Sequence, residues 1–578
     1  MIKRLIRCVR EFKWAAILSP LCMMGEVYME VRIPGIIATI VDFGIKPGDM
    51  NVVLVQGLML VLSALCSLGF GVLSAVFASY AATGFARNLR HDMYHRVQSF
   101  DFSNIDKLST SSIVTRLTTD VAHIQMTFQM MIRMAVRCPM MVILASIKVY
   151  RLSPRLCLIY VVALPLLCLG LFALVKLVFP IFDRVFKTYD KLNSVVQENL
   201  HGMRVVKSYV REEKETEKFT SISGGIYKDF VKAERIMAFN NPMMQLAVYT
   251  CIILISYLGA VMIVESGDTT FTTGNLTSMF TYTTQILMGL MMLSMVFVML
   301  TMSRAPMRRT YELLVETPDL HNPANPVTEV KDGSIDFENV SFRYSKEATR
   351  NALEDIDLHI RAGMTVGILG GTGASKSTLV QLIPRLYDVS QGTVKVGGVD
   401  VREYDMTALR NEVAMVLQKN VLFSGSIKDN LRWGNPDATD EEMIHACRLA
   451  CAHDFIMSFP NGYDTHIEQG GKNVSGGQKQ RLCIARALLK KPKILILDDS
   501  TSAVDTHTDA MIRKAFAEEI PGTTKLIIAQ RVASVQDADL IIVMDGGRVA
   551  AQGDHDTLLR TSHIYREVFE SQIKGGEE

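Results

Sequence analysis

The alternation of apolar and polar stretches divides this chain of 578 residues into two halves. Up to about residue 303, apolar runs recur that are long enough to cross a bilayer as helices, which takes about 20 residues each. From about residue 327 onward, short apolar strands alternate with glycine turns and amphipathic helices, as in a soluble α/β domain. The pattern predicts a membrane protein with a C-terminal cytoplasmic domain.

Six apolar runs have the length of a membrane span. They cover residues 14–43, 52–80, 128–150, 156–179, 243–264 and 276–302. The links after the second and fourth runs are long and rich in charge, and as helices they would project about 25 Å or more beyond the bilayer. These two hairpins would reach a cytoplasmic domain, and we expect their tips, residues 110–116 and 200–207, to dock on it.

The distribution of Lys and Arg predicts the orientation. Basic residues gather at the N-terminus, in the two long links and after the sixth run, whereas the short link 265–273 has none. The positive-inside rule therefore places the N-terminus, the hairpins and the C-terminal domain in the cytoplasm. Residues 1–13 alternate basic and apolar side chains, which predicts an amphipathic helix on the inner leaflet. The net charge of +2 gives no argument for nucleic-acid binding, and we expect none.

Charged side chains also lie inside the apolar runs. Glu26 and Glu30, like Arg133 and Arg137, are four residues apart and so share a helix face. Two interpretations are open: the pairs neutralise each other across packed helices, or they line a substrate cavity. The methionine-rich sixth run, from Met288 to Met302, has the same ambiguity between helix packing and an adaptable binding surface.

A glycine-rich loop follows the strand-like run 364–369. A phosphate-binding loop needs backbone N–H groups, close approach without side chains, and the N-terminus of a helix. Lys376 would contact the phosphate oxygens, and the Ser377 hydroxyl would bind Mg²⁺. The loop consists of Gly370, Gly371, Thr372, Gly373, Ala374, Ser375, Lys376, Ser377 and Thr378, with Ser375 where a last glycine is expected. We predict ATP and Mg²⁺ as cofactors.

Further motifs follow this loop in a recognisable order. They are Gln418, the run Val474-Ser-Gly-Gly-Gln-Lys-Gln-Arg481, the strand ending in Asp498-Asp499, Asp505, and Gln530 after another apolar strand. Together they resemble the nucleotide-binding domain of ATP-binding cassette (ABC) transporters. With six spans ahead of one cassette, nearly the whole chain resembles a half-transporter of the exporter type, of the heterodimeric multidrug-resistance kind.

The resemblance implies a fold class and a set of domains. The fold would be a six-helix all-α transmembrane domain of the type I exporter (type IV ABC) fold, followed by an α/β P-loop domain. The domains would be an elbow helix at 1–13, a transmembrane domain at 14–310, a linker at 311–330 and a nucleotide-binding domain at 331–578.

The resemblance also implies roles for single residues. Tyr344 would stack on adenine, Gln418 and Asp498 would contact Mg²⁺, and Asp505 would communicate across a dimer of cassettes. The signature residues Ser475, Gly476, Gly477 and Gln478 would close over ATP held by the partner cassette.

Two positions depart from the family pattern. Asp499 stands where a glutamate acts as general base, and Gln530 stands where a histidine contacts the γ-phosphate. Asp499 has one methylene less of reach, and Gln530 lacks the positive charge available to histidine. The resemblance therefore implies a degenerate site that binds ATP but hydrolyses it poorly, and a second, non-identical half-transporter with the competent site.

We expect ATP-driven export of amphipathic or lipid-like compounds by alternating access, in a plasma membrane of bacterial type. Two alternatives stay open: a lipid or lipopeptide flippase or importer on the same scaffold, and a non-transporting, ATP-sensing regulatory subunit. The six spans and the two hairpins argue against the regulatory subunit.

Overall fold

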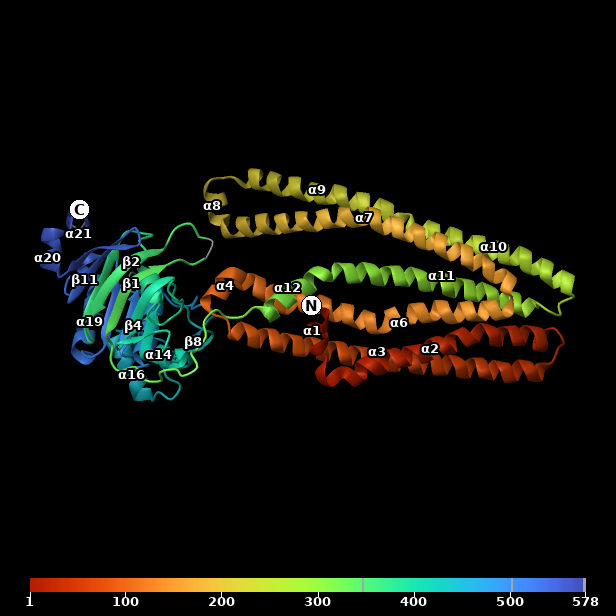
Figure 1. The fold of residues 1–578 in the computed structure, drawn as a ribbon, viewed down its shortest axis with the longest axis horizontal. Coiled ribbons are helices and arrows are strands. Elements are labelled where there is room, and N and C mark those ends of the chain that lie inside the picture. Colours follow the sequence, from red (N-terminus) through yellow and green to blue (C-terminus); the bar gives the residue numbers. More distant parts are fainter. Residues whose placement is uncertain (346–347, 501–502, 575–578) are drawn as a thin grey trace. The chain divides into compact units, whose positions relative to one another are not determined.

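The computed structural model describes residues 1–345, 348–500 and 503–574 and divides into two compact units (Figure 1). The helical unit contains Met1–Gln98 and Ser109–Glu316. The cassette unit contains Thr317–Glu578 together with the short segment Ser99–Leu108. The predicted fold class is confirmed: an all-helical membrane domain precedes an α/β domain.

The six predicted spans lie on six long helices. These are α2 (Lys13–Thr39), α3 (Met50–Gln98), α6 (Val121–Leu152), α7 (Pro154–His201), α10 (Asn240–Ser266) and α11 (Thr273–Met302). Five of the helical segments described are long and apolar enough to cross a membrane. The sixth helix, α2, is 27 residues long but carries Glu26, Glu30 and Arg32.

Local sequence signals set the ends of these helices. The Ser153 hydroxyl accepts a hydrogen bond from the Leu156 amide at 3.3 Å and caps α7, with Pro154 at its first position. Gly267 ends α10 in the left-handed conformation, with φ of 60°. The Thr272 hydroxyl then caps α11 by accepting a hydrogen bond from Asn275. The link between the fifth and sixth spans is therefore as short as the sequence predicts.

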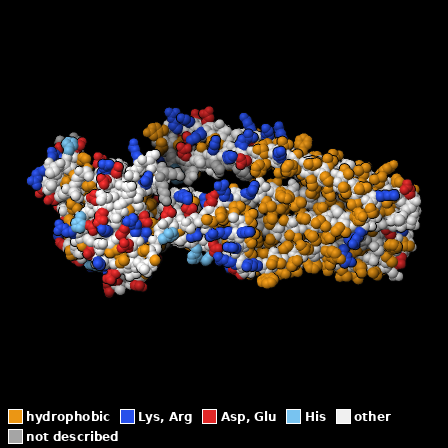
Figure 2. Space-filling model, viewed as in Figure 1, with side chains coloured by type: hydrophobic (Ala, Val, Ile, Leu, Met, Phe, Trp, Pro, Cys, Tyr) orange, Lys and Arg blue, Asp and Glu red, His pale blue; other side chains and the backbone are white. Residues whose placement is uncertain are grey.

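Shorter helical elements complete this unit. They are α1 (Ile2–Arg7), α5 (Thr110–Thr115), α8 (Met203–Ser208), α9 (Glu212–Ala238) and α12 (Arg304–Val315), with single turns at Arg10–Phe12, Ile40–Ile45 and Arg116–Asp120. Helices α2, α3, α6 and α11 pack together, while α7 packs against α9 and α10 (Figure 1). Hydrophobic side chains form a broad exposed band over the helical unit (Figure 2), as expected of a surface that faces lipid.

The cassette unit is built on two sheets. The larger has the order β12-β11-β3-β10-β9-β6, and all its neighbouring pairs are parallel except β11 with β12. Its strands are β12 (Arg548–Gly553), β11 (Leu540–Asp545), β3 (Thr365–Gly370), β10 (Thr524–Ile528), β9 (Ile494–Asp498) and β6 (Val413–Val416). Strands β9 and β10 are buried along their whole length, which explains their continuous apolar sequences.

The smaller sheet is antiparallel, with the order β2-β1-β4-β5. Its strands are β2 (Leu353–Ile360), β1 (Ile335–Phe342), β4 (Gln391–Val396) and β5 (Val399–Asp400), and β7 (Gly425–Ser426) pairs separately with β8 (His466–Ile467). The helices are α13 (Lys376–Gln381), α14 (Met406–Glu412), α15 (Ile427–Arg432), α16 (Asp440–Leu449), α17 (His453–Met457), α18 (Gly476–Leu488), α19 (Thr506–Glu519), α20 (His555–Thr561) and α21 (His563–Lys574).

The first hairpin is divided between the two units, and docking of its predicted tip, residues 110–116, stays a prediction. The segment grouped with the cassette is Ser99–Leu108, which contains helix α4 (Phe102–Leu108), whereas residues 110–116 belong to the helical unit. The two segments are separated at Ser109, which has φ of 53° and caps α5. At the second hairpin, α8 overlaps the predicted tip, residues 200–207, and ends one residue beyond it.

Candidate nucleotide-binding site

The parallel register of the large sheet gathers the predicted site at one edge. Ile528 of β10 pairs with Asp498 of β9 and with Ile368 of β3. The phosphate loop, Asp499 and Gln530 follow directly after these three strands, so they meet at the carboxyl edge. Ligands of open α/β sheets bind at this edge.

The phosphate loop leads from β3 into α13. A Cβ on Gly370 would lie 2.3 Å from the Met544 carbonyl oxygen, so this position admits only glycine. Gly373 has φ of 85°, which also favours glycine, although the space around it is open. The Lys376 ammonium donates to the carbonyl oxygens of Gly370 and Gly371 at 2.8 and 2.9 Å and therefore lies across the loop.

Ser375, which replaces an expected glycine, adopts the left-handed conformation with φ of 65° and ψ of 26°. This backbone region costs an L-residue about 1 kcal/mol or more relative to glycine. Serine in place of the expected glycine therefore adds backbone strain to the phosphate loop.

The residues expected to bind Mg²⁺ lie side by side. The Ser377 hydroxyl donates to Asp498 Oδ1 at 2.9 Å, and Asp498 is only 3% exposed at the end of β9. Burial raises the pKa of the Asp498 carboxyl, and burial also lowers the pKa of Lys376. A hydroxyl and a buried carboxylate are the hard oxygen donors that suit Mg²⁺, so these residues fit the ion. Gln418 follows β6 and is exposed.

Asp499 and Gln530 contact each other directly. The Gln530 side-chain amide donates to Asp499 Oδ2 at 2.9 Å. Asp499 has φ of 48°, and its backbone amide donates to the Ile528 carbonyl oxygen. The residue in the position of the base is therefore engaged by the residue in the position of the switch, and both lie at the edge that holds the phosphate loop.

Tyr344 lies beside the phosphate-loop helix. It is 50% exposed, and its hydroxyl shares a 2.9 Å hydrogen bond with the Thr378 hydroxyl. The Tyr344 ring meets the Tyr387 ring edge-on with centroids 5.2 Å apart. A half-exposed ring held at one edge is free to stack on a nucleotide base with its open face.

The signature run forms the start of helix α18. The Ser475 hydroxyl accepts from the Gln478 amide, and the Gln478 side chain accepts from the Ser475 amide, which makes a capping box. Ser475 and Gly476 are exposed, and a Cβ on Gly477 would lie 2.8 Å from the Ala503 carbonyl oxygen. Asp505 caps α19 by accepting from Thr508 at 2.9 Å. The signature therefore presents the N-terminus of a helix to solvent.

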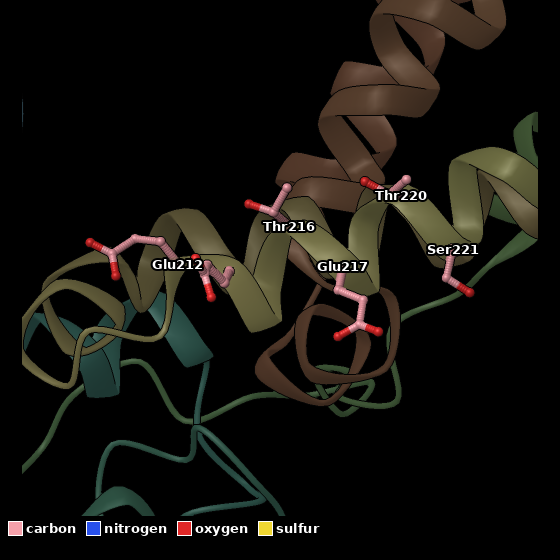
Figure 3. Close-up of a pocket in the computed structure, with 6 residues that line it drawn as sticks. Glu212, Thr216, Glu217, Thr220 and Ser221 are labelled. Carbon is pink, nitrogen blue, oxygen red and sulfur yellow. The ribbon is translucent and has the colours of Figure 1, made fainter.

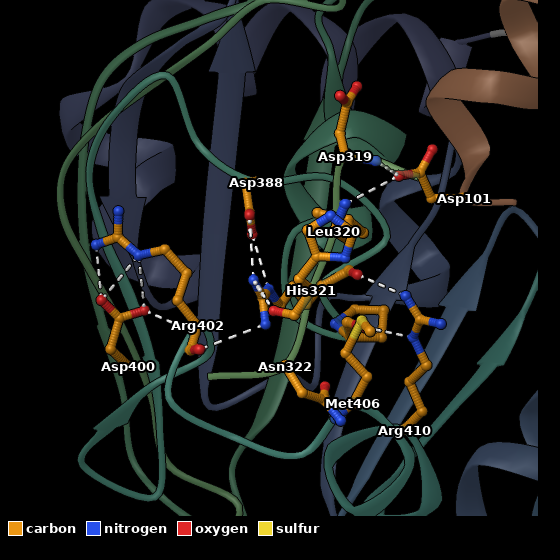
Figure 4. A network of polar contacts seen from close by, with 12 residues as sticks. Asp101, Asp319, Leu320, His321, Asn322, Asp388, Asp400, Arg402, Met406 and Arg410 are labelled. Atoms are coloured by element: carbon orange, nitrogen blue, oxygen red, sulfur yellow. Dashed lines mark hydrogen bonds and ion pairs between the residues drawn. The ribbon is translucent and has the colours of Figure 1, made fainter. Parts of the chain in front are cut away.

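Sequence reasoning missed a polar network beside the site (Figure 4). Asp101, which precedes α4, accepts hydrogen bonds from the backbone amides of Asp319 and Leu320 at 2.7 and 3.1 Å. Arg385 pairs with Asp388 at 2.8 Å and also donates to the His321 carbonyl oxygen. The network holds the hairpin segment and residues 319–321 on the cassette.

A second contact ties α4 to the aromatic cluster of Tyr344 and Tyr387. The Tyr387 hydroxyl donates to Asp106 Oδ2 at 2.8 Å, and Phe102 lies 6.0 Å from the Tyr387 ring. Burial and the Asp106 carboxylate raise the pKa of Tyr387, so the phenol stays protonated as a donor. The apolar spacing of Phe102, Ile105 and Leu108 was the signal in the sequence that could have identified this helix.

Glu26, Glu30 and Arg137 form one charged cluster across α2 and α6. The Arg137 guanidinium contacts Glu26 and lies 2.8 Å from Glu30 Oε2. Arg133 does not join these pairs, and its buried Nε has no hydrogen-bond partner among the described residues. The structure therefore brings three of the four predicted charges together, in the arrangement expected of mutual neutralisation.

An open hollow of about 610 Å³ lies along α9 (Figure 3). Its lining residues are Glu212, Glu213, Thr216, Glu217, Thr220 and Ser221. None of them belongs to the predicted nucleotide site or to the charged cluster of α2 and α6.

Comparison with known proteins agrees with this architecture. Residues 16–303 match the model of the ABC transporter transmembrane region, and residues 353–502 match that of the ABC transporter ATP-binding domain. The chain is 33% identical over 572 residues to the uncharacterized ABC transporter ATP-binding protein YfiB of Bacillus subtilis, which covers 99% of both chains. It is 31% identical over 575 residues to YknV of the same organism, covering 98% of this chain and 94% of the relative.

A solved structure gives the same result for the fold. The ATP-bound structure of a bacterial Atm1-family ABC exporter matches with a TM-score of 0.82 and 25% identity, covering 98% of each chain. The match extends over both the helical and the cassette unit. The chain therefore belongs to the ABC transporter family and has the exporter arrangement, with the transmembrane and ATP-binding domains fused in one polypeptide.

Proposed function

We propose that this chain is one half of a heterodimeric ATP-driven exporter and that its own phosphate loop forms a slow, ATP-retaining site. The observation that carries the proposal is the Asp499–Gln530 pair beside a phosphate loop that fits MgATP. The exposed, capped signature helix supports the second half of the proposal, because it would complete a competent site on a non-identical partner.

The chemistry at Asp499 explains why hydrolysis would be slow. A general base has to come within about 2.6–3.2 Å of the attacking water or a bridging water. The aspartate side chain is one methylene shorter than glutamate, and its Oδ2 already accepts the Gln530 amide. Inefficient general-base catalysis costs roughly 10²- to 10⁴-fold in rate. Gln530 can donate to a γ-phosphate oxygen but supplies no positive charge.

Binding would be less affected than hydrolysis. Lys376, Ser377 and Asp498 supply the cation, the hydroxyl and the carboxylate that hold MgATP in such loops. Bound Mg²⁺ would neutralise charge on the β- and γ-phosphates. Tyr344 offers an open ring face for the base. The site therefore combines intact groups for binding with substituted groups for hydrolysis.

For the transported substrate we propose amphipathic or hydrophobic compounds, including lipid-like molecules. The methionines of α11 support this class: Met288, Met291, Met292, Met295 and Met302 are exposed in the single chain and adapt readily to varied apolar partners. A flippase or importer of lipids or lipopeptides uses the same features and is separated from export by the direction of transport. A regulatory, non-transporting role is disfavoured by the α4–cassette contacts, which suit mechanical coupling.

ATP turnover tests the proposal. The chain is purified alone and after co-expression with the non-identical half-transporter encoded beside it, each with and without Asp499→Glu. We expect low ATPase activity for the single chain and a large rise with the partner. Full activity of a homodimer of this chain, unchanged by the partner, would overturn the proposal. Transport into inside-out vesicles by the pair, compared with right-side-out vesicles, then separates export from import.

A further inference from the structure

The C-terminal helix reaches the loop that carries Gln530. The Gln572 side chain makes two hydrogen bonds to the backbone of this loop, donating to the Gln530 carbonyl oxygen at 2.8 Å and accepting from the Val532 amide at 2.8 Å. One side-chain amide thus bridges the backbone on both sides of Arg531. The Gln572 amide donates one hydrogen bond and accepts another, as the backbone of a paired β-strand does. It therefore fixes the loop at two points.

The helix that presents Gln572 is anchored independently of this contact. Tyr565 is 1% exposed, and its hydroxyl shares a 2.6 Å hydrogen bond with His555 Nδ1. Phe569 packs edge-on against the His555 ring at 5.1 Å and against the cassette core. Tyr565, Phe569 and Gln572 are spaced four and three residues apart and so share one helix face. The packing of α21 therefore places Gln572 next to the loop, and this placement does not depend on the Gln572 hydrogen bonds.

We infer that Gln572 is a positioning residue for the ATP site: α21 clamps the Gln530–Val532 loop so that the Gln530 amide stays on Asp499. The inference rests on the proposed function, because it concerns how long this site holds ATP. Gln572 acts only through the loop backbone, and Gln530 Nε2 makes the contact with Asp499. Loss of the clamp would let the loop move away and would open the site more often.

The size of the effect follows from the two bonds. Loss of one uncharged hydrogen bond changes an equilibrium by roughly two- to tenfold. The two bonds are exposed enough for water to replace part of their strength. We therefore expect Gln572→Ala to speed ATP release from this site roughly five- to tenfold.

The experiment uses the full heterodimer. Labelled ATP is loaded with Mg²⁺, free nucleotide is removed, and the retained label is followed over time for wild type, Gln572→Ala and Ser571→Ala. Ser571 is the matched control, because its hydroxyl donates to the Val568 carbonyl oxygen within α21. Gln572→Glu adds a second test, since a carboxylate can accept from Val532 but cannot donate to Gln530. We expect release to be fastest in Gln572→Ala, intermediate in Gln572→Glu, and unchanged in Ser571→Ala.

The outcomes separate the inference from the proposed function. If wild type retains no ATP, the proposed slow site is wrong. If wild type retains ATP and Gln572→Ala releases it at the same rate, the clamp is wrong while the slow site stands. Thermal unfolding of the three variants detects a general loss of packing. If Ser571→Ala releases ATP as fast as Gln572→Ala, the clamp is also overturned.

Discussion

At the residue scale, the substitution with the clearest structural consequence is Ser375 in the phosphate loop. Its left-handed backbone tolerates serine at some cost, and a β-branched side chain fits this region far worse. We expect Ser375→Gly to keep the stability of the cassette within about 1 kcal/mol, because relief of strain offsets the greater freedom of glycine when unfolded. We expect Ser375→Val to lose about 1–2 kcal/mol and to weaken ATP binding.

Thermal unfolding and the binding of a fluorescent ATP analogue check both variants. Ser375→Gly is the control for removal of the side chain, because glycine lacks the hydroxyl but adopts the left-handed conformation without strain. Equal behaviour of Ser375→Val and wild type would contradict the assignment of strain to this position.

The pH dependence of Mg²⁺ binding is a second prediction at this scale. Burial raises the pKa of Asp498, so the folded cassette holds its proton more tightly than the unfolded chain does. The stability from this group is therefore full below the ordinary carboxyl range, near pH 3.9, and is lost as pH rises through the folded pKa. Mg²⁺ needs the ionised carboxylate, so we expect Mg²⁺ affinity in the presence of ATP to fall as pH is lowered through the raised pKa of Asp498.

Titration of Mg²⁺ against a fluorescent ATP analogue at several pH values measures this. Asp498→Asn is the control, because any pH dependence that it retains belongs to the phosphates of the nucleotide. We expect the variant to bind Mg²⁺ weakly at every pH. If Mg²⁺ affinity changes with pH equally in wild type and in Asp498→Asn, Asp498 is not the source of the pH dependence.

At the element scale, helix α4 contacts the tyrosine pair that lies beside the phosphate-loop helix. Asp106 accepts from Tyr387, and Tyr387 packs on Tyr344, which is expected to stack on the base. We expect Tyr387→Phe to keep the ring contact, lose the bond to Asp106, and reduce stimulation of ATPase by transported substrate about two- to tenfold with little change in basal ATPase. Substrate-stimulated and basal ATPase in proteoliposomes give the comparison.

Asp106→Asn is the matched variant, because an amide oxygen can still accept from the phenol. It should stay near wild type. Equal loss in Tyr387→Phe and Asp106→Asn would mean that the hydrogen bond needs a charged acceptor, and no loss in either would exclude α4 as a coupling contact of this kind.

The charged cluster of α2 and α6 gives a second test at this scale. Arg137 serves two carboxylates, so Arg137→Met would leave both without a cation. We expect a loss of roughly 1–3 kcal/mol, below the full cost of breaking a buried pair because these side chains keep some exposure. Arg133→Met is the control and should lose less, since Arg133 makes neither pair. Unfolding in detergent measures both, and altered substrate stimulation at full stability would favour a cavity wall instead.

The fold was predictable from sequence where a feature depends on hydropathy and strand order. The six apolar runs located the long helices, and the motifs located the loops that follow strands β3, β9 and β10, which the parallel register then brings to one sheet edge. Contacts between residues far apart in the sequence were not predictable, because the pattern of a helix face does not indicate which residue it will contact. Arg137 rather than Arg133 meets the glutamates, and α4 groups with the cassette although nothing in its sequence indicates this. Gln572 gave no signal, since an isolated glutamine near a terminus is common on surfaces.

At the scale of the whole molecule, the proposed asymmetry makes a prediction that a single chain cannot display. The Ser475 hydroxyl and the N-terminus of α18 are exposed, so in a head-to-tail pair they would contact ATP bound to the partner. If the partner holds the competent site, signature substitutions in the two halves have unequal effects. We expect Ser475→Arg in this chain to abolish most ATPase activity of the heterodimer, because the bulky cation fills the space of the γ-phosphate at the fast site.

The same substitution at the matching position of the partner would disturb only the slow site, where little turnover occurs. We expect it to shorten ATP retention there and to leave most of the ATPase activity. Ser475→Gly controls for folding, because glycine at an N-cap costs only a few tenths of a kcal/mol while it removes the hydroxyl. ATPase activity and retained ATP, measured on the same preparations, distinguish the two sites. Equal losses from the two signature substitutions would mean that both sites turn over alike, and the distinction drawn from Asp499 and Gln530 would fail at the level of the assembled transporter.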